Sequence, residues 1–232
     1  MIRSITRQKS IEEIERLLGN YTRVFIIGCG TCVTLCCTGG LPEVLQMKEK
    51  LETANRLVTG YLVLPVACDE ITTEALAVNG SAISEAQVLL IMTCAFGVQT
   101  VARRLEKIVI PALDTLFIGK ERGLGEFHEV CTQCGACIIG ETGGICPVTT
   151  CHKGLVNGPC GGTKDGKCEI DPQKDCAWTV IYQRLENMGR LDLMRRYQGP
   201  RNHQVAPRPG VFFVPQEGHA PSWPKGASKP WP

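Results

Sequence analysis

Cysteine is the feature of this sequence that most restricts what the chain can fold into. There are 14 cysteines among 232 residues, several times the usual content of a protein of this size. Residues 1–20 carry charges throughout and lack the apolar core of a signal peptide, so we predict an amphipathic helix there and a cytoplasmic protein. Because cytoplasmic thiols stay reduced, most of the cysteines are predicted to bind metal ions or clusters.

The remaining composition is that of an ordinary globular protein. Hydrophobic residues make up 44% of the chain, which is enough for a real core, and the net charge is only +2. Such a balance gives no general attraction to nucleic acid or to an anionic membrane surface. No apolar run approaches the roughly 20 residues that a membrane span needs.

The apolar runs predict the fold class, an α/β protein with a small parallel sheet and flanking helices. Runs 23–28, 60–67 and 88–93 are continuous and of strand length, as expected for strands buried on both faces. Segments 109–110 and 115–118 are weaker candidates for a fourth strand. Helix-like stretches alternate with these runs, at residues 41–55, 70–78 and 97–107.

Composition divides the chain into three predicted regions. Residues 1–120 form the α/β domain, which contains the first group of cysteines. Residues 121–198 hold a cysteine-rich segment, which has too few apolar residues to fold without metal, and a helix at 177–197 with one apolar face. Residues 199–232 contain eight of the 14 prolines and are predicted to form an extended tail.

A first group of six cysteines follows the predicted strands. The group is Cys29, Cys32, Cys36, Cys37, Cys68 and Cys94. The carboxyl ends of parallel strands share one edge of a sheet, where ligands bind, so these thiols are expected to converge. Four thiolates, two of them from the Cys29–Cys32 pair, are suited to an iron–sulfur cluster or a zinc ion.

Other interpretations of this first group stay open. Cys94 and Cys37 fit equally well as small buried hydrophobic residues, and the Cys29–Cys32 pair fits a redox-active dithiol. The glycines at positions 28, 30, 39 and 40 either direct N–H groups at the site or only form turns.

The second group contains the strongest motif of the chain. Residues 131–147 read CTQCGACIIGETGGICP, which keeps the C-x2-C-x2-C spacing and the final Cys-Pro of bacterial ferredoxins but lengthens the last gap to eight residues. An iron–sulfur cluster is favoured over zinc here. The eight candidate ligands are Cys131, Cys134, Cys137, Cys146, Cys151, Cys160, Cys168 and Cys176. His152 is a further candidate ligand.

The later part of this segment resembles the methylenetetrahydrofolate reductase C-terminal family. The resemblance rests on NGPCGG at 157–162, GKCE at 166–169 and the C-x-W-x3-Y element at 176–182, in that order. Together with GCGTC at 28–32, the chain is similar to the small MetV-type subunit of the acetogen enzyme, over roughly residues 20–198.

The resemblance implies a non-catalytic subunit of an oxidoreductase complex in one-carbon metabolism, the Wood–Ljungdahl pathway of anaerobes. Such a subunit would hold two [4Fe-4S] clusters and pass electrons to the flavin of a MetF-type TIM-barrel partner, which reduces methylenetetrahydrofolate to methyltetrahydrofolate. Further electron-donating subunits would belong to the complex. The predicted partner contacts are helix 177–197 and the tail, with Trp178, Trp223 and Trp231 as anchors. The alternative is a zinc-binding structural subunit that carries no electrons.

Overall fold

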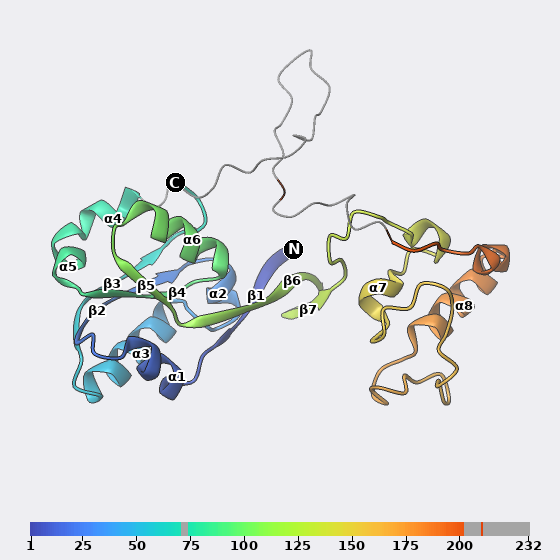
Figure 1. The fold of residues 1–232 in the computed structure, drawn as a ribbon, viewed down its shortest axis with the longest axis horizontal. Helices are drawn as coiled ribbons and strands as arrows, with labels where there is room; N and C mark the ends of the chain where they lie inside the picture. Colours follow the sequence, from blue (N-terminus) through green and yellow to red (C-terminus); the bar gives the residue numbers. More distant parts are fainter. Residues whose placement is uncertain (71–73, 202–209, 211–232) are drawn as a thin grey trace, which may run out of the picture. The chain divides into compact units, whose positions relative to one another are not determined.

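The computed structural model describes residues 1–70, 74–201 and 210, and the chain divides into two units, Met1–Glu129 and Val130–Pro232 (Figure 1). The predicted boundary at residue 120 falls inside a strand, and the division comes after residue 129. Most of the predicted tail, including Trp223 and Trp231, lies outside the described residues. Helices and strands of the first unit are β1 (Ile2–Gln8), α1 (Ile11–Leu18), β2 (Arg23–Cys29), α2 (Cys32–Leu35), α3 (Leu41–Thr53), β3 (Leu57–Leu64), α4 (Ala75–Val78), α5 (Gly80–Glu85), β4 (Val88–Met92), α6 (Ala95–Arg104), β5 (Ile108–Pro111), β6 (Leu113–Gly123) and β7 (Glu126–Glu129).

A parallel sheet of four strands forms the centre of the first unit, in the order β3-β2-β4-β5. The α/β class and the three strands expected from the apolar runs are therefore confirmed. The fourth strand, β5, comes from the weaker candidate at 109–110. Every residue of β4 is buried, as expected for a central strand covered on both faces.

Alternate residues of the central strands supply two separate cores. Phe25 and Ile27 pack with Val101 of α6 and Ile83 of α5 on one face of the sheet. The other face packs against α1 and α3, which contribute residues such as Leu18, Leu51 and Met47. Figure 1 shows α4, α5 and α6 on one side of this sheet and α1 and α3 on the other. Each fully buried aliphatic side chain contributes about 1.5–3 kcal/mol, so both cores stabilise the sheet.

A second, antiparallel sheet in the order β1-β6-β7 corrects two predictions. Residues 2–8 are strand β1, not helix, and only 11–18 of the predicted helix are helical. The strand forms because Ile2–Gln8 pairs with Lys120–Leu113, more than 100 residues later in the chain, a partner that local periodicity does not reveal. Segment 115–118 lies in β6 of this sheet and not in the parallel one.

The second unit has little regular structure. Its described helices are η2 (Ile139–Glu141), α7 (Pro147–Thr150), α8 (Ala177–Asn187) and η3 (Leu191–Arg195). The predicted helix 177–197 is thus interrupted after residue 187. Its apolar face exists, because Trp178, Ile181 and Leu185 are buried together with Leu193. This core is small for a unit of this length.

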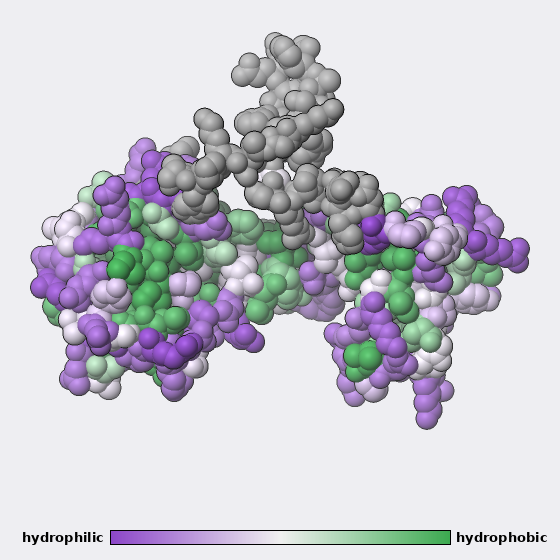
Figure 2. Space-filling view, in the orientation of Figure 1, coloured by the Kyte–Doolittle hydropathy of each residue, from purple (hydrophilic) through white to green (hydrophobic). Residues whose placement is uncertain are grey.

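The surfaces of both units are mixed in character. Hydrophilic residues (purple) cover much of the visible face of each unit, and apolar residues (green) appear between them (Figure 2). Among the described residues, no helix combines the length and the apolar character that crossing a membrane demands.

Candidate functional site

Three cysteines of the first unit lie where neighbouring strands of the parallel sheet end. Cys29 is the last residue of β2, Cys68 follows β3, and Cys94 follows β4. Because β2 lies between β3 and β4, these three positions share one edge of the sheet. Cys32 begins α2, three residues after Cys29. We call Cys29, Cys32, Cys68 and Cys94 the edge set.

Cys68 interacts electrostatically with the other members of the edge set. Burial raises the pKa of the Cys68 thiol above its ordinary value, and the negative charges of Cys94, Cys29 and Cys32, in that order, raise it further. The thiolate form of Cys68 is therefore unfavourable at this position. A bound cation or cationic cluster relieves this repulsion, because it favours the deprotonated form that metal ligands need.

Hydrogen bonds hold the Cys29 sulfur in place. The backbone N–H of Ala67 donates to Cys29 Sγ at 3.4 Å, and the hydroxyl of Thr31 lies 3.2 Å from the same sulfur. Cys29 and Cys94 are only 5% and 7% exposed. Hydrogen bonds to a cluster sulfur and low solvent exposure are two of the factors that set the reduction potential of an iron–sulfur site.

Close backbone approaches bring the loops of the edge set together. A Cβ added to Gly39 would lie 2.0 Å from the carbonyl oxygen of Met92, at the end of β4. A Cβ added to Gly97, in the first turn of α6, would lie 2.9 Å from Cβ of Ala67, the neighbour of Cys68. Glycine at these two positions therefore lets the loops that carry the cysteines pack closely.

The other two cysteines of the first group have different surroundings. Cys36 follows α2, where its N–H donates to Cys32 O at 3.0 Å, and it directs its sulfur to the carbonyl oxygen of Ser4 in β1, 3.8 Å away. Cys37 is exposed and has a left-handed backbone, with φ of 52°. Neither contributes to the raised pKa of Cys68, so we leave both out of the edge set.

The glycines of this loop do not direct their N–H groups at the sulfurs. The N–H of Gly30 donates to Leu64 O at 2.8 Å, and the N–H of Gly40 donates to the Glu43 carboxylate at 2.9 Å. The N–H of Gly39 donates to Val33 O at 3.3 Å. For these three glycines the turn and packing interpretation is correct.

In the second unit, the loop 131–137 contains Cys131, Cys134 and Cys137 at the spacing of a ferredoxin loop. The Thr149 hydroxyl, on α7, donates to Val130 O at 3.2 Å and so ties α7 to the start of this loop. Cys146 immediately precedes α7. Cys146 therefore lies next to a helix that is hydrogen-bonded to the start of the loop, which is consistent with its predicted role as a fourth ligand.

Arg201 is a functional candidate that the sequence did not reveal. Its guanidinium donates to Cys134 Sγ at 2.8 Å and to Ala136 O at 2.9 Å. A backbone hydrogen bond at Ala136, followed by the Arg201 contact, lowers the pKa of the Cys134 thiol below its ordinary value. No local pattern could have indicated this contact, because 67 residues separate the two partners.

The last four cysteines of the second unit line one pocket. They are Cys151, Cys160, Cys168 and Cys176, which we call the pocket set. Burial raises the pKa of Cys176, but hydrogen bonds from the backbone and hydroxyl of Thr179, the backbone of Trp178 and the hydroxyl of Thr163 outweigh it, so the net pKa is lowered. Cys176 immediately precedes the eleven-residue helix α8, whose first N–H groups favour an anion.

Two other candidates have structural partners. His152 lies 3.9 Å from Asp171 and does not line the pocket of the last four cysteines. Trp178, proposed as an interface anchor, is 5% exposed, and its indole N–H donates to Leu155 O at 3.0 Å. Trp178 is therefore part of the core of the second unit.

The sulfurs are not yet arranged around a common point. Within residues 1–70, 74–201 and 210, no group of three or more His, Cys, Asp or Glu side chains has the arrangement of a metal site. Within the second unit, the pocket set lines one cavity, and binding of a metal there requires its thiols to turn towards that cavity. The donor set is chemically suited to iron–sulfur clusters or zinc, which both bind thiolates.

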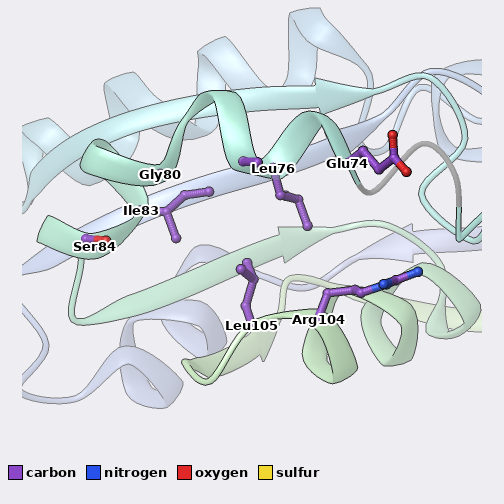
Figure 3. A pocket seen from close by; sticks show the side chains of 8 residues that line it. Glu74, Leu76, Gly80, Ile83, Ser84, Arg104 and Leu105 are labelled. Carbon is purple, nitrogen blue, oxygen red and sulfur yellow. The ribbon is translucent and has the colours of Figure 1, made fainter.

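One pocket of the first unit contains no cysteine. Leu76 and Ile83 of α4 and α5 face Leu105 across it, and Glu74 and Arg104 lie at its rim (Figure 3). Its volume is about 270 Å³. Arg104 pairs with Glu70 at 3.0 Å. Its lining is mostly apolar and includes no cysteine, so this pocket is not part of the predicted metal sites.

Fold and thiols together define a cysteine-rich α/β protein with a second unit that has a minimal core. Residues 110–204 match the family described as "Methylene-tetrahydrofolate reductase C terminal". This match confirms the resemblance to the methylenetetrahydrofolate reductase C-terminal family over less than half of the chain, a range that includes the described second unit up to Arg201. The match associates the chain with methylenetetrahydrofolate reductase. No curated protein and no solved structure matches the chain.

Proposed function

We propose that this chain is an accessory electron-transfer subunit of methylenetetrahydrofolate reductase, in the cytoplasm. The observation that supports the proposal is the edge set, whose four cysteines follow three neighbouring strands at one edge of the parallel sheet. Two of these thiols, Cys29 and Cys94, are buried, and the Cys29 sulfur accepts a hydrogen bond from Ala67 N–H; such thiols are suited to an iron–sulfur cluster. Such a cluster supplies one-electron transfer.

The edge set would hold the first [4Fe-4S] cluster through Cys29, Cys32, Cys68 and Cys94. Here the protein fixes the sulfurs and limits water, since Cys29 and Cys94 are nearly buried. Ala67 N–H and the Thr31 hydroxyl stabilise negative charge on Cys29.

A second [4Fe-4S] cluster would be held by Cys131, Cys134, Cys137 and Cys146. The short spacers let the three loop thiols turn inward, and Gly135, with φ of 78°, allows the required turn. Arg201 places a positive charge beside Cys134. That charge favours the more negative, reduced state of the site.

The catalytic step would belong to a partner subunit. A (β/α)8 barrel needs about 250 residues, and the described residues of the first unit form a four-stranded sheet instead. We therefore assign folate binding and hydride transfer to a flavin-containing TIM-barrel reductase, to which this chain would deliver electrons. Further subunits of the complex would supply them.

The test uses the chain co-produced with such a flavin reductase and purified without oxygen. About eight iron and eight sulfide per chain, with reduced-cluster EPR signals, are expected for two cubanes. Cys68→Ser should retain about four iron and lose rapid flavin reduction by reduced ferredoxin. Cys37→Ser is the matched control, because Cys37 is exposed as Cys68 is but lies outside the edge set, and this variant should behave as the wild type does.

Two results would contradict this function. One is stoichiometric zinc without iron in the wild-type complex. The other is a Cys68→Ser complex whose flavin is reduced as fast as that of the Cys37→Ser complex.

A further inference from the structure

The pocket set lines a small cavity in the second unit. Cys151, Cys160, Cys168 and Cys176 line a cavity of about 20 Å³. A site for a single water-sized particle needs about 10–15 Å³. The cavity therefore has room for one ion.

Backbone hydrogen bonds fix the positions of these cysteines. The N–H of Cys176 donates to Gly166 O at 2.7 Å, and the N–H of Cys168 donates to Lys174 O at 2.9 Å. The Thr163 hydroxyl closes the same turn on Lys167 O at 3.0 Å. Cys168 and Cys176 are thus presented by one tight loop.

The other two cysteines are presented by turns of their own. The N–H of Cys151 donates to Pro147 O at 3.0 Å, at the end of α7. Cys160 precedes Gly161, whose φ of 83° belongs to the left-handed region that glycine adopts readily. Four thiols therefore reach one cavity from separate turns that the backbone already defines.

The second unit also needs a cross-link. Its described hydrophobic core is one small cluster, whose buried residues are Cys176, Trp178, Ile181, Leu185 and Leu193. A core of this size contributes too little to order the long loops around it. Cys151 packs against the same core, so an ion bound between Cys151 and Cys176 would join the loops directly to it.

We propose that Cys151, Cys160, Cys168 and Cys176 bind a single zinc ion, which holds the second unit together and carries no electrons. Four thiols lose four protons to solvent on binding, and the thiolates surround Zn²⁺ tetrahedrally. All four positions of the ion are then filled by protein, which is typical of structural zinc. Ala177 and Trp178 contribute apolar lining to the cavity, and Lys153 and Glu169 line it as well.

This inference is independent of the proposed function, because its ligands are separate from those assigned to the two clusters. The first experiment is zinc K-edge X-ray absorption of the wild-type chain, purified with its reductase partner. One zinc per chain with four sulfur ligands at about 2.3 Å is expected. The absence of zinc, or oxygen and nitrogen ligands in place of sulfur, would overturn the proposal even if no variant folds.

Variants then locate the zinc. Cys168→Ser should lower zinc content at least tenfold at limiting zinc, leave iron and sulfide unchanged, and expose the second unit to proteolysis. Cys137→Ser should lower iron and leave zinc unchanged, and Cys36→Ser, whose sulfur faces Ser4 O, should change neither. Loss of about four iron from Cys168→Ser, with zinc unchanged, would instead assign the pocket to a cluster.

Discussion

Gly39 offers a sharp test of how the edge set is assembled. This residue is buried in the loop between α2 and α3. A Cβ at this position would lie 2.0 Å from the carbonyl oxygen and 2.9 Å from the carbonyl carbon of Met92. Both atoms belong to the backbone at the end of a central strand, so no side-chain rotation can relieve the overlap. Gly39→Ala must therefore move the loop or the strand.

The expected cost is at the upper end of the usual range. Overpacking of a core costs about 1–3 kcal/mol, and displacement of backbone places Gly39→Ala at about 3 kcal/mol or more. At about 4 °C per kcal/mol for a unit of this size, the Tm should fall by about 12 °C. Because Cys29 N–H donates to Gly39 O at 3.1 Å, the iron bound by the edge set should fall as well.

The assay is differential scanning calorimetry with iron analysis of the same samples. Gly80→Ala is the matched control, since no atom lies within 4 Å of its added Cβ, at the start of α5. That change should be neutral or stabilising by about 0.5–1 kcal/mol. Equal Tm values for the two variants would refute the close approach of the loop to β4.

Three further predictions concern charge, the second core and the cluster environment. In the wild type, Lys9 Nζ lies 2.6 Å from the Asp114 carboxylate, and this pairing lowers the pKa of Asp114. Asp114→Asn should therefore lower the free energy of unfolding by about 0.5–1 kcal/mol above pH ~4, since the pair is accessible to solvent. This difference between wild type and variant should vanish as the pH falls through the pKa of Asp114 in the folded state. Urea unfolding of wild type and variant across this range measures it, and a difference that persists at pH 2 would contradict the assignment. Ile181→Ala, at a fully buried position, should cost about 3 kcal/mol and speed hydrogen exchange in α8 but not in β4; equal acceleration in both would argue against separate units. If the cation of Arg201 favours the reduced state by about 1 kcal/mol, Arg201→Ala should make the reduction potential of the proposed Cys134 site more negative by about 40 mV. Arg201→Lys keeps the charge and should retain most of the wild-type potential. Redox titration followed by EPR measures both potentials, and an unchanged potential in Arg201→Ala would show that Arg201 does not act on this site.

The sequence was sufficient for those features that depend on local pattern. Continuous apolar runs identified β2 and β4, because strands buried on both faces need an apolar residue at nearly every position. The same kind of run identified β3, although this edge strand is only partly buried. Parallel order then predicted that Cys29, Cys68 and Cys94 share an edge. The strand β1 was missed because its stability comes from pairing with β6, at the far end of the unit.

The surroundings of the individual cysteines depend on long-range packing and could not be predicted from their spacing. Cys32 and Cys36 both lie in the loop after β2, and only the packing of β1 over that loop directs Cys36 to Ser4 O. In the second unit, Cys151 lines the cavity and Cys146 does not, although the two cysteines flank α7 and are only five residues apart. The Arg201 contact with Cys134 likewise depends on tertiary structure alone.

The order of the parallel sheet has a consequence for synthesis on the ribosome. Cys29 and Cys94 belong to adjacent strands, β2 and β4, but 65 positions of sequence separate them. The edge set is therefore incomplete until β4 has emerged and paired, and loop closure of this length is slow relative to local folding. The pocket set spans only residues 151–176, so its loops can close as soon as that stretch is free. If both sets bind metal, they should become able to do so at different times during synthesis. The edge set would have to wait for the sheet to be completed, whereas the pocket set would need only a short stretch of nascent chain.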